Sequence, residues 1–102
     1  MRGAKVELIE HRVITDKKTS IVDLDLICKN LKEYSLFQNA ILTKYGIHVP
    51  SEDVKWELVG IGLSDEGFFV VDLLNRKDRE ILFDIIQKTM SDKGIKTVIE
   101  DA

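Results

Sequence analysis

Two neighbouring segments near the middle of the chain limit the fold more than any other feature, because together they predict a β-hairpin. Segments 55–63 (KWELVGIGL) and 67–74 (GFFVVDLL) are rich in β-branched and aromatic residues and flank the polar turn SDEG. Such a pattern is typical of two antiparallel strands. Gly60 and Gly62 interrupt the first of them, which suggests a bulge or a close approach of another backbone.

The hairpin is followed by signals for a helix. Asn75 is a suitable N-cap, Asp78 stands three residues later in the manner of a capping box, and Gly94 follows the segment's end. We therefore expect a helix that runs to about Asp92. Its apolar residues cover more than one stripe, so it should contact a second element besides the sheet. These residues are Ile81, Leu82, Phe83, Ile85, Ile86 and Met90.

The first half of the chain has a similar but less distinct order. Segments 5–15 and 20–27 flank the polar turn 16–19. The alternation in VDLDL favours a strand over 20–27, antiparallel to 5–15. Apolar residues at helical spacing then predict a helix within 31–45, closed by Gly46.

Short words recur between the two halves and predict an internal repeat, 1–53 and 54–102. IVDL at 21–24 matches VVDL at 70–73, and GI is followed six residues later by ED at both 46–53 and 94–101. Self-similarity of this kind is typical of a supersecondary unit used twice. The expected fold is α+β, with an antiparallel sheet packed in two layers on two main helices and a duplicated ββα-ββα order.

An alternative fold treats residues 20–45 as one long helix, with Ser20 and Asp23 as its capping box. The order is then βαββαβ, the ferredoxin-like arrangement, with 95–99 as the last strand. The two alternatives differ over residues 20–30, where the alternation favours the strand.

Size and charge exclude several classes of protein. The 102 residues predict a single domain, and a hydrophobic share of 44% is enough for a core. The formal charge is −3 and no basic stripe is present, so nucleic-acid binding is not favoured. Cys28 is the only cysteine, which rules out an intrachain disulfide. No apolar run approaches the roughly 20 residues of a membrane span, and we expect a small acidic cytoplasmic protein.

Aspartates among apolar residues identify the candidate interaction surface. Because a lone ionised carboxylate is costly in an apolar core, the strand faces that bear Asp23, Asp25 and Asp72 are expected to form one solvent face of the sheet. The simplest interpretation is that these aspartates solvate one side of the domain. Apolar side chains share that face, and an exposed patch of this kind is also typical of a binding site. Cations crowd the start of the last helix against its dipole, which fits either a solvated helix terminus or residues that serve a partner. The candidate residues are Phe68, Val70, Asp72, Leu74, Asp23, Asp25, Phe83, Arg76 and Arg79.

These features predict a non-enzymatic protein–protein interaction module, such as a regulator, inhibitor or adaptor, that is homodimeric. A monomer of this size cannot easily bury both the strand face of Phe68, Val70 and Leu74 and an outer helix flank formed by Phe83 and Met90, and two-fold pairing is the commonest way to cover such a patch. We expect no catalytic residues, no cofactor and no metal, because neither a Cys-x-x-Cys pair nor a His pair at helical spacing is present. One alternative is a nucleic-acid-binding regulator that uses Arg76, Lys77, Arg79, Lys17 and Lys18. Another is a small metal-dependent nuclease or hydrolase, with Asp23 or Asp25 and the triplet DVK at 53–55.

Overall fold

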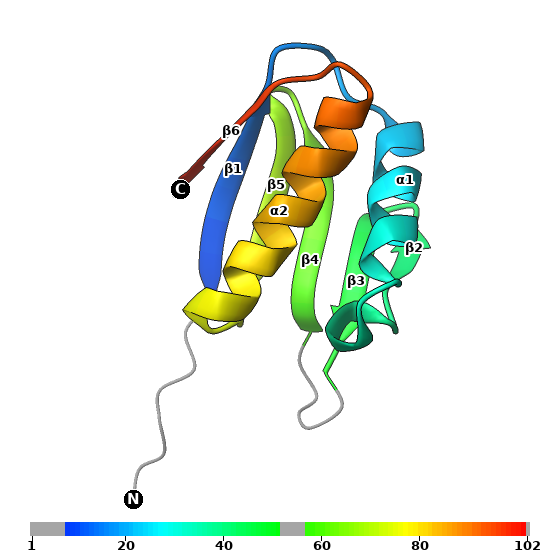
Figure 1. The fold of residues 1–102 in the computed structure, drawn as a ribbon, viewed down its shortest axis with the longest axis vertical. Coiled ribbons are helices and arrows are strands. Elements are labelled where there is room, and N and C mark those ends of the chain that lie inside the picture. The colour runs from blue at the N-terminus through cyan, green and yellow to red at the C-terminus, as the bar shows by residue number, and fades with distance from the viewer. Residues whose placement is uncertain (1–7, 52–56, 102) are drawn as a thin grey trace, which may run out of the picture.

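The structure, a computed structural model, describes residues 8–51 and 57–101 (Figure 1). The elements are β1 (Ile9–Thr15), α1 (Ile21–Leu31), the 3₁₀ turn η1 (Ser35–Phe37), β2 (Ile41–Thr43), β3 (Gly46–Pro50), β4 (Glu57–Ser64), β5 (Gly67–Asp72), α2 (Arg76–Asp92) and β6 (Thr97–Asp101). Among the described residues, the strands form one antiparallel sheet in the order β2-β3-β4-β5-β1-β6. The predicted α+β class is confirmed.

The β4–β5 hairpin and α2 form where the sequence predicted them, although residues 55 and 56 lie outside the described part. The turn closes at Gly67, whose φ is +151°, and a Cβ there would overlap the carbonyl oxygen of Val13. Asn75 is the N-cap of α2 and accepts a hydrogen bond from the Asp78 amide at 2.8 Å. Gly94, with φ +76°, follows the end of the helix. The local signals therefore specify these elements.

The predicted strand over 20–27 is wrong, because these residues belong to α1. Ser20 is the N-cap, and its amide donates to the Asp23 carboxylate at 2.8 Å, as the alternative interpretation expected. The alternation VDLDL is short enough to fit both periods. Helical spacing prevails because it gathers one buried stripe on α1. This stripe comprises Asp23, Leu24, Ile27, Cys28 and Leu31.

The helix predicted within 31–45 is also wrong, as is the long helix 20–45. α1 ends at Leu31, and the chain continues through η1 into the β2–β3 hairpin. Phe37 in η1 is fully buried, which fixes this connection against the core. Gly46 has φ +125° and begins β3 instead of closing a helix.

The elements β1, α1, β4, β5, α2 and β6 follow the βαββαβ order, and β2 and β3 extend the sheet beyond β4. This is the strand arrangement of the ferredoxin-like alternative with an added hairpin. The duplicated ββα order is wrong, because 21–24 is helical whereas the matching 70–72 is a strand.

Both helices lie along the same face of the sheet in Figure 1. The core between them and the sheet includes Val13, Phe68, Val70, Leu82 and Ile86, all fully buried. α2 also packs beside α1, so the predicted second contact of this helix is present. No described helix covers the opposite surface, which we call the helix-free face. It carries Phe69 and Val71 of β5, Glu10 and Arg12 of β1, and Gly60 and Gly62 of β4. None of the described helices has the length and apolarity needed to cross a bilayer.

Candidate interaction surface

The two faces of β5 are the reverse of the prediction. Phe68 and Val70 are 0% exposed and Leu74 is 7% exposed, because all three side chains face the helices. Phe69 points the other way and is 41% exposed. The predicted patch of Phe68, Val70, Asp72 and Leu74 is therefore part of the core and not a surface.

Asp72 can be buried because its charge is not alone. The Arg79 Nε lies 3.1 Å from both carboxylate oxygens, and Arg79 Nη2 lies 2.9 Å from Oδ1. The Leu74 amide donates to Oδ1 at 2.9 Å, and His11 Nε2 lies 2.7 Å from Oδ2. Burial raises the pKa of Asp72, but the hydrogen bonds from Arg79, Leu74 and His11 outweigh it and hold the pKa below its usual 3.8. The same pairing raises the pKa of Arg79.

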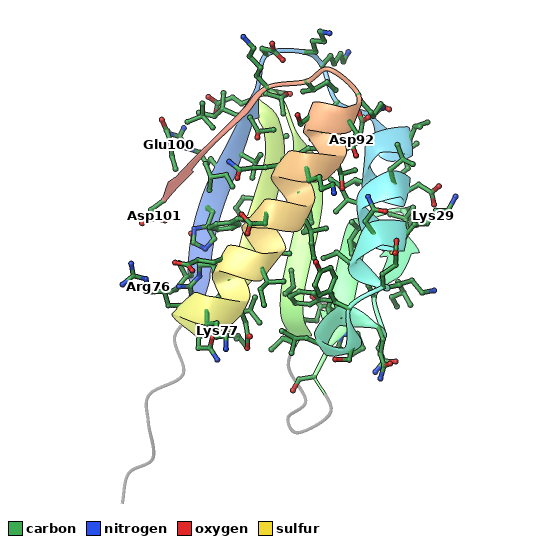
Figure 2. The ribbon with its side chains drawn as sticks, viewed as in Figure 1. Lys29, Arg76, Lys77, Asp92, Glu100 and Asp101 are labelled. Carbon is green, nitrogen blue, oxygen red and sulfur yellow. The ribbon has the colours of Figure 1, made fainter. Side chains whose placement is uncertain are left out.

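His11 joins this buried charge to the edge of the sheet. Its Nδ1 lies 2.9 Å from Oδ1 of Asp101, which Figure 2 shows at the end of β6. The ring also meets Phe83 edge-on, with centroids 4.8 Å apart, so Phe83 packs inward instead of forming an outer flank. Both ring nitrogens are thus occupied by protein carboxylates. The cluster resembles a catalytic set in its residue types, but its contacts connect β1, β5 and β6.

Asp23 and Asp25 lie on α1 and do not join Asp72. Asp23 is buried and bonds Lys93, just beyond the C-terminal end of α2, whereas Asp72 bonds Arg79 in its first turn. Asp25 pairs with Lys29 at 3.0 Å on the surface of α1. The predicted row of aspartates on one solvent face is therefore wrong.

The basic residues of the nucleic-acid alternative are not gathered on one surface. Figure 2 shows Arg76 and Lys77 at the start of α2, and Arg76 is 92% exposed. Arg79 is occupied by Asp72. Lys17 and Lys18 lie in the β1–α1 loop, at the opposite end of the molecule in Figure 1.

The metal-dependent alternative gains no support from the described ranges 8–51 and 57–101, where no cluster of potential metal ligands occurs. The triplet 53–55 lies outside the described residues.

The helix-free face has Phe69 near its centre. In the strand register Phe69 lies between Gly62 of β4 and Arg12 of β1. Two residues further along β5, Val71 lies between Gly60 of β4 and Glu10 of β1. An exposed aromatic ring therefore stands beside a stretch of β4 that carries no side chain at two alternate positions.

The fold does not require a glycine at position 62. The φ angle of Gly62 is not positive. Among the atoms of other segments, an added Cβ would lie within 4 Å of the Tyr45 carbonyl oxygen, at 3.6 Å, which is an ordinary van der Waals contact. An added Cβ at Gly60 would meet Val71 Cγ2 at 3.1 Å. Glycine weakens a strand, and its use in a strand interior often marks the close approach of another backbone or a ligand. The glycines of GIG were therefore a visible signal in the sequence. That they lie beside Phe69 could not be predicted from it.

Carboxylates surround this centre. Arg12 contacts Glu66 at 3.3 Å and Glu100 at 2.8 Å, and both pairs are exposed. At the other side, His48 Nδ1 lies 2.6 Å from Glu57 Oε1, although this contact lacks hydrogen-bond geometry. The face also carries the exposed apolar residues Ile41 and Val98, together with Glu10.

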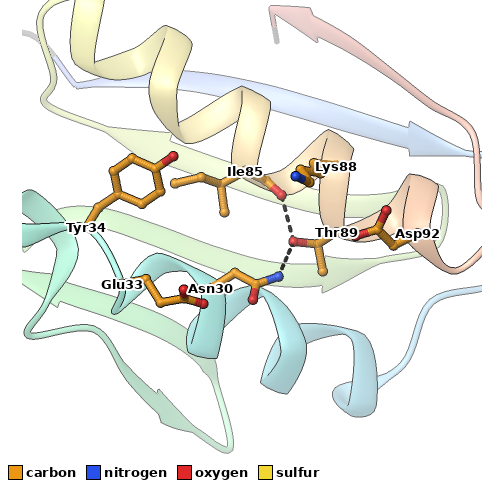
Figure 3. A pocket seen from close by; sticks show the side chains of 7 residues that line it. All are labelled: Asn30, Glu33, Tyr34, Ile85, Lys88, Thr89 and Asp92. Atoms are coloured by element: carbon orange, nitrogen blue, oxygen red, sulfur yellow. Dashed lines mark hydrogen bonds between the residues drawn. The ribbon is translucent and has the colours of Figure 1, made fainter.

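A second candidate is a hollow of about 230 Å³ between α1 and α2 (Figure 3). Asn30 Nδ2 donates to Thr89 Oγ1 at 2.8 Å, and Thr89 Oγ1 donates to the Ile85 carbonyl at 2.7 Å. These bonds join the helices and occupy the most buried polar groups. The volume is below the roughly 300–1,000 Å³ of ordinary ligand sites, so this hollow does not suit a typical small-molecule ligand.

The fold and this surface define a small α+β protein with a sheet face that no described helix covers and that bears an exposed aromatic residue. No protein-family model, curated protein or solved structure matches the chain.

Proposed function

We propose that the protein is a non-enzymatic interaction module that binds another protein through the helix-free face of its sheet. The observation that carries the proposal is the exposed Phe69 beside Gly62, a glycine that the fold does not need. Aromatic anchors supply much of the binding energy of protein interfaces. A strand position without a side chain lets a partner approach the sheet closely. A regulator, inhibitor or adaptor would use such a surface.

The homodimer expected from the sequence rested on surplus apolar surface at Phe68, Val70, Leu74, Phe83 and Met90. The structure packs Phe83 against the core and buries the other four, so this reason for a dimer no longer holds. Two copies meeting through the helix-free face would also bring like-charged glutamates together, which opposes association. We therefore assign this face to a different protein.

The proposal is tested by co-purifying binding partners with a tagged form of this protein. The wild type is compared with Phe69→Ser and with Val22→Ser, a control at a 59% exposed apolar residue on α1, away from the face. We expect wild type and Val22→Ser to co-purify the same protein, and Phe69→Ser to lose it while its circular dichroism is unchanged. The purified partner must then bind the wild type in calorimetry. Equal capture by all three proteins, or capture of nothing by the wild type, contradicts the proposal.

Light scattering on the same samples tests self-association. We expect a monomer, and a dimer that Phe69→Ser dissociates would assign the face to a second copy of the chain.

A further inference from the structure

We propose that the partner presents an extended segment bearing lysine or arginine side chains, which lies over Gly62 and Phe69. This inference rests on the proposed function and specifies the chemistry of the partner. It is carried by the charges of the helix-free face and by the open backbone of β4.

The helix-free face is negatively charged around its apolar centre. It carries Glu10, Glu57, Glu66 and Glu100, with the basic residue Arg12 among them. Arg12 is already flanked by two of these carboxylates, at 3.3 Å and 2.8 Å, so its charge is largely compensated within the face. A cationic segment fits this field, whereas nucleic acid and acidic protein surfaces do not.

The apolar centre suits the stems of basic side chains. Lysine and arginine lay their methylene groups along apolar surface while their charged ends reach polar partners. Phe69 and Val71 provide that surface, and the ring of Phe69 can also attract a cation over its face. Glu57 lies on one side of this centre, whereas Glu10 and Glu100 lie on the other. Basic side chains on either side of a crossing segment would each find a carboxylate.

The open backbone favours an extended segment over a bulky element. Position 62 has space for a Cβ that the sequence does not fill, and an added Cβ at position 60 would also contact Glu57 Oε2, at 3.7 Å. Because a side chain at 62 would fill that space, it would hold a partner's backbone away from the sheet. It should leave the fold of this protein intact, so the two effects can be separated.

Amide NMR spectra of the full chain test the inference. The probes are two short synthetic peptides, one alternating lysine with threonine and the other alternating glutamate with threonine. We expect the lysine peptide to shift the amides of Gly60, Gly62, Phe69 and Arg12, and the glutamate peptide to leave them unchanged. Equal shifts with both peptides, or shifts confined to the helices, would overturn the inference.

Two variants make the test specific to this face. Gly62→Ala should fold with no loss of thermal stability yet bind the lysine peptide roughly tenfold more weakly, a change of about 1.4 kcal/mol. Glu100→Gln should also weaken binding, whereas Asp84→Asn on α2 is the matched control that should not. Unchanged binding by Gly62→Ala contradicts the close approach at this position.

Failure of the basic-segment inference can be distinguished from failure of the proposed function. Capture that depends on Phe69, without any preference for the lysine peptide, leaves the interaction module standing and removes the basic segment. Capture that ignores Phe69 removes both.

Discussion

The guanidinium of Arg79, in the first turns of α2, holds the buried carboxylate of Asp72 at the end of β5, with nitrogen–oxygen distances of 2.9 Å and 3.1 Å. A cation near a helix N-terminus opposes the helix dipole. The partner that compensates this placement is within the chain itself. Arg79 Nη2 also donates to the Leu74 carbonyl at 2.8 Å, so one side chain fixes the connection between β5 and α2.

Asp72→Ala should lower the free energy of unfolding by about 3 kcal/mol, because it leaves Arg79 and His11 without their shared buried partner. Urea unfolding followed by circular dichroism measures the loss. Asp25→Ala is the control, since its pair with Lys29 is largely exposed. A loss no larger than that of the control contradicts the role assigned to Asp72.

The contribution of Asp72 should disappear in acid. Its pKa in the folded chain is below the usual 3.8, so the folded state favours the ionised form. Above about pH 5 the carboxylate is ionised in both states and the contribution is complete. As the pH falls below 3.8 the unfolded chain takes up the proton first, and the contribution is lost through the folded pKa. The difference in unfolding free energy between wild type and Asp72→Asn should shrink below about pH 4, and a constant difference contradicts this.

Asp23→Ala should destabilise the protein by about 1–2 kcal/mol, because Asp23 caps the start of α1 and bonds Lys93 beyond the end of α2. Asp25→Ala, two residues away on the same helix, should cost about 0.5 kcal/mol or less. Thermal unfolding of the two variants compares them directly. Equal losses would show that the capping contact contributes nothing beyond an ordinary surface charge.

Two glycines next to each other across β3 and β4 should respond in opposite ways to alanine. Gly46→Ala forces a side chain onto a residue with φ +125° and against the carbonyl oxygen of Ile61, so it should cost more than about 1 kcal/mol. Gly62→Ala has open space and should stabilise the strand by roughly 0.5–1 kcal/mol. Melting temperatures measure both effects. A destabilising Gly62→Ala would show that the fold itself needs this glycine.

The sequence was sufficient to predict the β4–β5 hairpin and α2, because each boundary carries its own local signal. Asn75, Asp78 and Gly94 mark the ends of α2 without reference to the rest of the molecule. Residues 20–27 lack such independence. Their alternation suits a strand, whereas the capping box of Ser20 and Asp23 suits a helix. Tertiary packing of the stripe from Asp23 to Leu31 decides between these conflicting local signals in favour of the helix.

The candidate site could not be predicted for a related reason. The assumption that Asp72 must face solvent assigned the wrong face of β5 to the surface. The assumption failed because Arg79, seven residues after Asp72, and His11, 61 residues before it, both bind the Asp72 carboxylate. Once Asp72 is inside, Phe69 is outside. A contact with His11, 61 residues away, leaves no local pattern in the sequence, whereas the glycines of GIG lie on the strand beside Phe69.

The most direct test of the account is photo-crosslinking from the helix-free face. A photoreactive phenylalanine analogue replaces Phe69 in one sample and Val22 in another, and both are irradiated in extract from cells that contain the protein. We predict one discrete crosslinked protein at position 69, joined through a segment rich in lysine or arginine, and none at position 22. The same products at both positions, or none at position 69, would contradict the assignment of this face as the binding surface.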